Sequence, residues 1–437
     1  MASILRPLSA SISSSSSFAL CRPLLRSAYL AAAPSATRLI STSSLFSLHG
    51  KEEKKKKVRP RGFNFPLLVR DFVQEGLYGK GGYFSTAELI FKSEPLDFTG
   101  MLGETEYKRE LAKLYRESDV GWTTPVEIFK PWYGRAIANY ITSSAEDEDI
   151  VIYEIGGGRG RLLIDTVEYL RQHAPHRLSR LDYNIIDIST AMINDVKAKI
   201  EADMKGRVTL HNLSALEWKK REDRKCFVVA LEVLSNFPSD KIVVTNNEVE
   251  EVHVEFSSDD GLIERRWPLR DNKLKYALDA ASFVEYTKRG GGGGLSSLLS
   301  RVMGASAGAE GYIPTNIVQL FAILKSKFPN SKVIFPDFDR FQSPCTGYCA
   351  PVVQLKKGGK TQMFSSYLAA ASKVCDVMFP LDFPAICEAY SNVTGKEGQV
   401  VTTEDFMLKY GELDNTMTLS GYNPLIDDYE NTKFLLS

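Results

Sequence analysis

The sequence predicts an α/β fold built on a largely parallel sheet with crossover helices, and three observations lead to this prediction. From residue 150 onward, short apolar segments alternate with segments whose apolar residues recur at helical spacing, which is the rhythm of parallel strands joined by helices. A glycine-rich segment follows the first of these strands, as in many α/β proteins. The chain has 437 residues, 43% of them hydrophobic and 25% charged, which is typical of a globular protein.

Composition and charge exclude several classes of protein. The 54 basic residues balance the 54 acidic residues, so net charge gives no reason to expect nucleic-acid binding. No stretch of about 18 apolar residues occurs, and we therefore expect no membrane-spanning helix. The six cysteines are too scattered for a disulfide framework. Cys345 and Cys349 have no histidine nearby and no second pair, so they predict no metal site. We expect a soluble protein from a reducing compartment.

Residues 1–50 predict an organellar transit peptide. They contain four arginines spread through Ser, Ala and Leu, with no Asp or Glu, and this composition is typical of such peptides. The segment after Arg38 resembles a mitochondrial processing site with cleavage near Ile40, so we predict a protein of the mitochondrial matrix. Because residues 13–17 are an unbroken run of serines, import into chloroplasts is an alternative. A disordered tail without a targeting role is the other alternative.

Composition divides the chain into four consecutive parts. We assign residues 1–50 to the transit peptide, 51–62 to a basic linker, 63–145 to an N-terminal helical segment and 146–437 to the α/β core, with a flexible glycine-rich insertion at about 288–311. The lysine run in the linker is typical of a solvated segment. Peripheral contact with an acidic surface or a cardiolipin-rich membrane is the alternative for this run.

The N-terminal helical segment contains a clear helix start. Apolar residues at helical spacing indicate a helix within residues 63–83. Farther along, Thr124 suits the N-cap, Pro125 the first helical position and Glu127 the third position after the cap. We expect this second helix to continue past Pro131 with a kink, because proline removes a backbone donor.

The elements of the core follow one another in a regular order. We predict strands at residues 150–155, 183–188, 208–212 and 226–231, with helices at 161–172 and 190–204. A hairpin at 249–256 and 262–267, a helix at 317–328 and a strand at 332–335 follow.

The most informative segment lies between the first core strand and its helix. It reads Glu-x-Gly-x-Gly-x-Gly, from Glu154 through Gly156, Gly158 and Gly160. A dinucleotide fingerprint would need glycine where Arg161 stands, which disfavours a nicotinamide-dependent oxidoreductase. The observed spacing is the pattern of class I methyltransferases, which bind S-adenosyl-L-methionine. Glycines let the backbone approach a ligand closely, and Glu154 suits the ammonium group of this cofactor. Simple tight packing of the turn is the alternative.

Later strand ends supply further candidate binding residues. Asp187 ends the second strand, where a carboxylate can accept both ribose hydroxyls. Ser214 and Ala215 follow the third strand, where adenine contacts normally lie. Glu232 ends the fourth strand at the open carboxyl edge of the sheet. Together these positions predict a Rossmann-like class I methyltransferase core with an S-adenosyl-L-methionine site at this edge.

These motifs make the chain resemble the MidA-type family of mitochondrial complex I assembly methyltransferases. Residues 121–128 resemble the family's Gly-Asp-Phe-Thr-Thr-x-Pro-Glu segment, and residues 232–238 resemble part of its Asn-Glu-x-x-Asp-x-x-Pro segment. The resemblance spans residues 63–437 and implies methylation of an arginine on a complex I subunit. Leu231 and Ser235 replace the family's Asn and Asp. A weakly active or inactive cofactor-binding assembly factor is therefore the alternative function.

Glu232 and Glu127 are the candidate catalytic residues. Methyl transfer from a sulfonium is an in-line displacement, so positioning supplies much of the acceleration. A guanidinium stays protonated until very high pH, and carboxylates that orient it and localise its charge are the expected solution. For Glu127, capping of the helix that begins at Pro125 is the alternative role.

Overall fold

A seven-stranded mixed sheet forms the centre of the computed structural model, and its order is β14-β15-β10-β5-β2-β3-β4. Five neighbouring strands are parallel: β10 (Ser331–Phe338), β5 (Cys226–Ala230), β2 (Ile150–Ile155), β3 (Leu181–Asp187) and β4 (Val208–Asn212). β15 (Thr432–Leu436) runs antiparallel between β10 and β14 (Gln399–Thr402). The predicted α/β fold is confirmed. Because the chain proceeds from β2 to β3 on one side and β5 lies on the other, a crevice is expected at their carboxyl ends.

The structure describes residues 57–85, 94–117, 123–146, 149–245, 248–280, 308–358 and 360–437. These residues belong to one compact unit, Leu39–Ser437. The predicted transit peptide, the first half of the basic linker and residues 288–307 of the predicted insertion lie outside the described residues. Among the described residues, we find no helix with the length and apolar character needed to cross a membrane.

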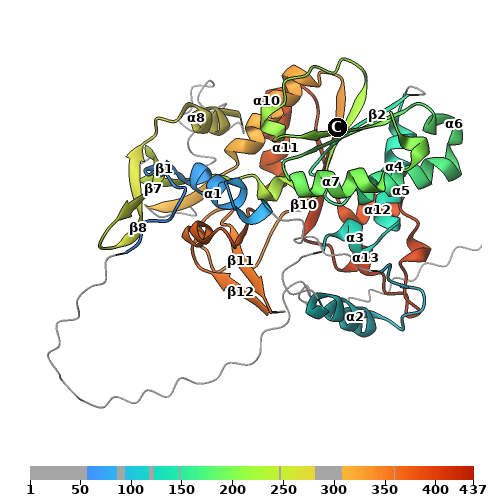
Figure 1. Cartoon of the computed structure of the whole chain (residues 1–437), viewed down its shortest axis with the longest axis horizontal. Coiled ribbons are helices and arrows are strands. Elements are labelled where there is room, and N and C mark those ends of the chain that lie inside the picture. Colours follow the sequence, from blue (N-terminus) through green and yellow to red (C-terminus); the bar gives the residue numbers. More distant parts are fainter. Residues whose placement is uncertain are drawn as a thin grey trace, which may run out of the picture. The chain divides into compact units, whose positions relative to one another are not determined.

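Helices cover both faces of the central sheet. α10 (Thr315–Lys327) and α11 (Phe383–Thr394) pack together, and their apolar side chains share one core with β2 and β5. α4 (Trp132–Ser144) packs against α5 (Arg161–His173), and in Figure 1 this pair is well separated from α10 and α11. The strands are buried on both faces and read as continuous apolar runs, which explains why their positions could be predicted.

Two predicted helices end earlier than expected. The helix predicted at 190–204 is α7 (Thr190–Lys199), followed by a separate 3₁₀ turn at Ala202–Met204. The helix predicted to kink at Pro131 is broken there into α3 (Pro125–Ile128) and α4, with Pro131 as the N-cap of α4. Proline is well placed beside a helix start because its missing N–H has no intrahelical partner there.

Two smaller antiparallel sheets accompany the central one. The first contains β1 (Leu67–Leu68), β6 (Asp240–Thr245), β7 (Glu248–Ser257), β8 (Gly261–Pro268) and β9 (Ala309–Ile313). The second contains β11 (Val352–Lys357), β12 (Lys360–Phe364) and β13 (Asp376–Met378). Because β1 pairs with β7, the N-terminal segment joins the fold through a strand as well as through its helices.

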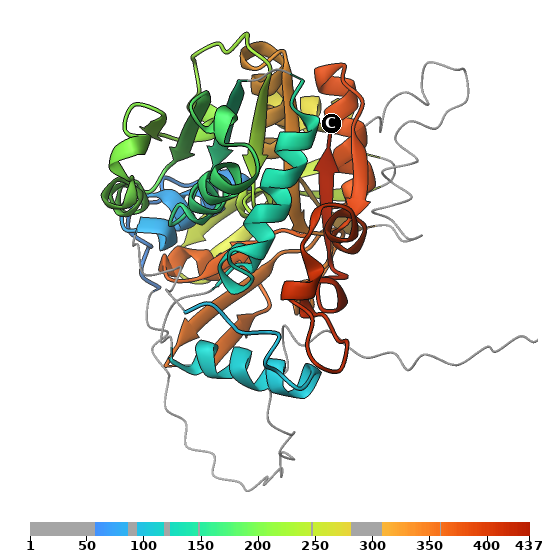
Figure 2. The same cartoon turned by 90° about the vertical axis from the view of Figure 1, so that its right-hand side faces the viewer.

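The remaining helices lie around these sheets. They are α1 (Val69–Tyr78), α2 (Glu104–Glu117), α6 (Pro175–Leu178), α8 (Asn272–Leu278), α12 (Thr403–Tyr410) and α13 (Pro424–Asp427). The segment before α2 lies beside a C-terminal loop (Figure 2), and the N–H of Leu419 donates to the carbonyl oxygen of Met101 at 3.0 Å.

Candidate active site

The predicted cofactor-binding glycines form a tight turn between β2 and α5. Gly156, Gly158 and Gly160 have backbone φ angles of +70°, +51° and +75°, a region that most other residues rarely adopt. A Cβ placed on Gly156 would lie 2.6 Å from Cγ2 of Val233, which follows β5. The backbone conformation therefore requires glycine, and the turn lies directly against the segment that carries Glu232.

Asp187, the last residue of β3, is bonded to the same turn. Its carboxylate accepts the N–H of Ser189 at 2.7 Å and also the N–H of Gly158. Asp187 is buried, and burial raises the pKa of its carboxyl group to about 6. Asn212, at the end of β4, donates to the carbonyl oxygen of Asp187 at 3.0 Å. The carboxyl ends of β2, β3 and β4 are thus connected by hydrogen bonds.

Glu154 is a buried carboxyl group one residue before the end of β2. It is 3% exposed, and it accepts a hydrogen bond from the hydroxyl of Tyr183 at 2.8 Å. Burial raises its pKa to about 7, and the charges of Asp187 and Asp165 act in the same direction. Within the described residues no ion pair neutralises Glu154. A buried carboxylate without a counter-ion suits a cationic ligand group, so this site fits the ammonium group of S-adenosyl-L-methionine.

The two residues predicted to contact adenine have structural roles in the folded chain. Ser214 is the N-cap of the 3₁₀ helix Ala215–Glu217, and its hydroxyl oxygen accepts the N–H of Leu216 at 3.2 Å. Ala215 is buried in the central core. Both follow β4 and are therefore near the edge that carries Asp187, and their contact with adenine stays a prediction.

Glu232 stands two residues after the end of β5 in an unusual conformation. Its φ angle is +53°, and its N–H donates to the carbonyl oxygen of Pro336 in β10 at 2.9 Å. Burial raises the pKa of its carboxyl group well above the usual range, and the charge of Asp337 raises it further. The hydroxyl of Tyr133, from α4, is within electrostatic reach of both acids. A carboxyl group in this environment is a strong proton acceptor once ionised.

Glu127, the other catalytic candidate, is buried and ion-paired. Its Oε2 lies 3.4 Å from Nζ of Lys130, which is also buried. Its charge also acts on Arg161 and Asp165 at the start of α5. Thr124 is the N-cap as predicted, but its side chain makes no capping hydrogen bond. The hydrogen bond that Thr124 would contribute to a capping box is therefore missing. Glu127 is paired with a cation, Lys130, whereas the charged group that acts on Glu232 is another acid, Asp337.

Two residues at this edge were not predicted from the sequence. Asp337 lies one residue before the end of β10, but the strand predicted at 332–335 stopped short of it. Tyr78, from α1, donates its hydroxyl to the carbonyl oxygen of Asn236 at 3.0 Å, and its pKa is raised by burial and by the charges of Asp376 and Asp187. The acids at or just after the ends of β2, β3 and β5 were the signal that could have pointed to Asp337.

Comparison with known structures confirms the fold class. The chain resembles a COG1565 superfamily member from Burkholderia thailandensis bound to S-adenosyl-homocysteine, with a TM-score of 0.57, 14% identity, and coverage of 85% of this chain and 87% of the other. A second structure, of a COG1565 superfamily protein from the same organism, gives a TM-score of 0.53, 13% identity and the same coverage. At such identity the likeness shows the fold, which is that of a class I methyltransferase.

The family follows from the sequence itself. Residues 133–402 match the family described as "Putative S-adenosyl-L-methionine-dependent methyltransferase". This match covers more than half of the chain, and the chain therefore belongs to this family, whose cofactor is S-adenosyl-L-methionine. No curated protein matches the sequence.

Proposed function

We propose that this protein transfers the methyl group of S-adenosyl-L-methionine to an arginine side chain of a complex I subunit in the mitochondrial matrix. The resemblance to the MidA-type family supports the substrate, and the N-terminal composition supports the compartment. The observation that carries the chemistry is the position of Glu232. Its neighbour Val233 packs against the glycine turn so closely that a Cβ on Gly156 would lie 2.6 Å from Cγ2 of Val233.

Different residues at the sheet edge would bind the cofactor and accept the proton. S-adenosyl-L-methionine supplies an electrophilic methyl group on a sulfonium. Glu154 would hold its ammonium group, and Asp187 would hold its ribose. Glu232 accepts a proton from the guanidinium nitrogen as the new C–N bond forms and the S–C bond breaks to leave a thioether.

An arginine acceptor suits the charges at this edge. A free guanidinium is protonated at neutral pH and is bound best by carboxylates that match its planar set of donors. Glu232 is such an acid, just after the end of β5, and its pKa is raised by burial and by the charge of the neighbouring Asp337. A cationic acceptor relieves the cost of ionising such groups.

A cofactor-binding assembly factor without turnover is the second candidate function. Its support is the sequence around Glu232, where Leu231 and Ser235 stand in place of the family's Asn and Asp. Ser235 is 1% exposed, so its side chain is part of the folded turn and is shielded from solvent.

Glu232→Gln separates the two candidates. We expect the variant to bind S-adenosyl-L-methionine within a few-fold of wild type but to transfer methyl groups about ten- to a hundred-fold more slowly, because a charge-assisted hydrogen bond is worth about 1.5–3 kcal/mol. Glutamine keeps the size of the side chain and one acceptor oxygen. Mass spectrometry would compare arginine methylation of complex I subunits in cells that lack the protein, express it, or express the variant.

The outcomes are distinct. Arginine methylation that is lost without the protein and restored by wild type but not by Glu232→Gln supports the enzyme. Unchanged methylation in cells that lack the protein, with complex I assembly impaired, supports the assembly factor. Calorimetric titration with S-adenosyl-L-methionine and with NADH is the binding control, and binding of NADH alone would contradict both candidates.

A further inference from the structure

Two consecutive residues of β10 hold the turn that begins with Glu232. The N–H of Glu232 donates to the carbonyl oxygen of Pro336 at 2.9 Å. The N–H of Ser235, three residues later, donates to Oδ2 of Asp337 at 2.9 Å. Asp337 thereby bonds to the turn through its side chain, and Pro336 does so through its backbone.

The backbone at Glu232 needs such support. Its φ angle of +53° lies in the left-handed region, where a glutamate is strained and persists only when the surrounding structure holds it. Asp337 is completely buried, and its other oxygen accepts the N–H of Phe338 at 2.8 Å. This carboxyl group is therefore rigid, and it fixes the turn through backbone N–H groups.

Asp337 is also a second acid near Glu232, and its charge raises the pKa of the Glu232 carboxyl group. In the described part of the chain, no ion pair neutralises Asp337. The titratable groups that face Glu232 from the elements packed against it are Asp337 of β10 and Tyr133 of α4. Two acids that share a buried site disfavour each other's ionisation, so each becomes a better proton acceptor.

We propose that Asp337 is the positioning residue for Glu232: by accepting the N–H of Ser235 it holds the turn that presents the Glu232 carboxylate to the methyl acceptor, and it places a second acid beside that carboxylate. This inference rests on the proposed function. As methyl transfer proceeds, the acceptor nitrogen gains the methyl group and loses a proton to Glu232, and the cofactor sulfur keeps the electron pair of the broken S–C bond. Asp337 touches neither reactant and acts through Glu232 alone.

Asp337→Asn tests the inference, because asparagine keeps an oxygen that can accept the N–H of Ser235 and removes the charge. We expect the pKa of Glu232 to fall by about one unit. The acid limb of the pH–rate profile should move to lower pH, and the rate on its plateau should fall several-fold because Glu232 becomes a weaker base. The pKa is read by ¹³C NMR of carboxyl-labelled protein, with the Glu232 signal assigned by its loss in Glu232→Gln.

Asp376→Asn is the matched control. Asp376 is also buried, with a pKa raised to about 7 by burial, and it accepts a hydrogen bond from Asn236, in the same turn, at 3.4 Å. Any general loosening of the turn would appear in both variants. Only Asp337→Asn should move the titration of Glu232, and an equal movement in both variants would overturn the proposal.

The pKa of Asp337 in Glu232→Gln provides a second test, which does not depend on the folding of Asp337→Asn. Because the coupling between two acids is mutual, Glu232→Gln should lower the pKa of Asp337, and glutamine preserves the volume of the side chain. If neither substitution changes the partner's pKa, Asp337 does not act on Glu232 and the inference is wrong.

Rates would be measured with an acetyl-Gly-Arg-Gly-amide peptide and with the complex I subunits found by mass spectrometry. Absence of methyl transfer by wild type to any of them overturns the proposed function together with the catalytic part of this inference. Normal transfer by wild type with an unshifted pH profile in Asp337→Asn overturns this inference alone.

Discussion

At the residue scale, glycine is required in the turn after β2 for both backbone conformation and space. Three of its glycines have positive φ angles, and Gly157, which does not, would place a Cβ 2.6 Å from Cγ2 of Ile185. The sequence predicted the turn because its spacing is distinctive. It could not predict the contacts with Ile185 and Val233, since Ile185 lies in β3 and Val233 follows β5, and both are distant from the turn in the chain.

Gly158→Val should abolish cofactor binding while the protein stays folded. The φ angle of +51° at Gly158 is strained for a β-branched residue, and left-handed backbone costs about 1–2 kcal/mol. The N–H of Gly158 also bonds to Asp187, so a shift of this backbone would disturb the predicted ribose ligand. Calorimetry with S-adenosyl-L-methionine should show at least a tenfold loss of affinity, about 1.4 kcal/mol.

Gly158→Ala is the control for this substitution, because alanine adds a similar backbone strain with much less bulk. A larger loss of affinity for valine than for alanine locates the ligand close to Gly158. Circular dichroism and urea unfolding confirm that both variants are folded. Normal binding by Gly158→Val would show that the turn serves packing alone.

Affinity for S-adenosyl-L-methionine should rise with pH between about 5.5 and 8. Burial raises the pKa of Asp187 to about 6 and that of Glu154 to about 7. Only the ionised carboxylates bind an ammonium group and ribose hydroxyls well, so protons must leave when the cofactor binds at low pH. Both pKa values are raised, which places the transition above pH 5.

Calorimetry in buffers of different ionisation enthalpy measures this proton release directly. Glu154→Gln should remove the upper part of the pH dependence, since glutamine is neutral at every pH in the range. A pH-independent affinity in the wild type would contradict the assignment of Glu154 and Asp187 as cofactor ligands.

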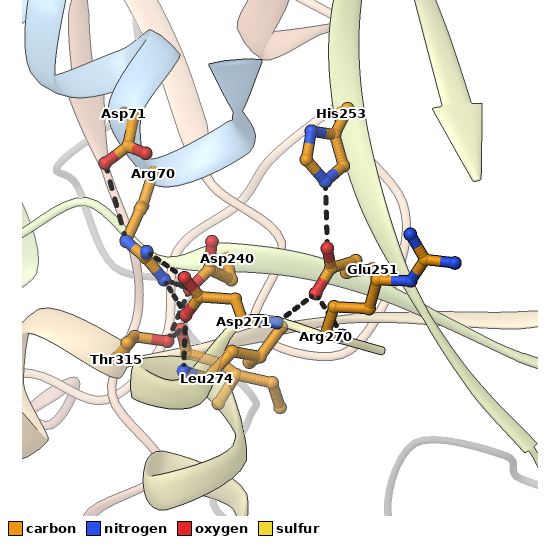
Figure 3. Close-up of polar contacts among 10 residues, drawn as sticks. Arg70, Asp71, Asp240, Glu251, His253, Arg270, Asp271, Leu274 and Thr315 are labelled. Carbon is orange, nitrogen blue, oxygen red and sulfur yellow. Dashed lines mark hydrogen bonds and ion pairs between the residues drawn. The ribbon is translucent and has the colours of Figure 1, made fainter. Parts of the chain in front are cut away.

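At the element scale, one buried arginine connects helix α1 to the rest of the fold. Figure 3 shows the Arg70 guanidinium between Asp240 of β6 and Asp271, the N-cap of α8. Both of its outer nitrogens bond to Asp271 at 2.9 Å, and the hydroxyl of Thr315 donates to Asp240 at 2.6 Å. This geometry is the bidentate arrangement that makes arginine suited to buried ion pairs.

Arg70→Met should destabilise the protein by about 3–5 kcal/mol, because removing one partner of a buried ion pair leaves the other charge unpaired. Burial already raises the pKa of Asp240 to about 6 in spite of Arg70, and the substitution should raise it further. Urea unfolding gives the loss of stability, and hydrogen exchange should show α1 exchanging faster.

Asp71→Asn is the matched control, since Asp71 is 51% exposed at its side chain and lies 3.5 Å from the same guanidinium. Exposed pairs contribute about 0–1 kcal/mol. If the two substitutions cost the same, the buried network does not hold α1 in place. Because α1 also carries Tyr78, which bonds to Asn236, a loosened α1 should weaken the edge near Asp187 as well.

At the scale of the whole molecule, the sequence predicted what short-range patterns encode. β2 and β4 have the predicted bounds, since one is a buried apolar run and the other lies between clear turns. The prediction failed where distant contacts decide the structure. β15 is short and depends on pairing with β10, and β1 has two residues and depends on pairing with β7.

The same distinction applies to the candidate site. Glu154 and Asp187 could be found because they stand at the ends of predictable strands. Asp337 was missed because β10 continues through Pro336, a residue that usually ends a central strand. Among the described residues, no ion pair neutralises Glu154 or Asp337. This could not be predicted from the sequence, because it depends on how several elements are arranged in space.

The mature protein should begin within about Ile40 to Leu45, as the charge pattern of the whole chain indicates. Acidic residues are absent up to Gly50 and start at Glu52, whereas the mature chain needs them for its charge balance. A basic, acid-free leader is the form that organellar import machinery accepts. N-terminal sequencing of the endogenous protein, purified from isolated mitochondria, would locate the cleavage, with plastids as the parallel source where the organism has them. Replacing Arg38 with glutamine should delay or shift processing, and replacing Arg6, farther from the site, should change it less. Retention of Met1 or Ala2 in the endogenous protein would contradict both the leader and the matrix location.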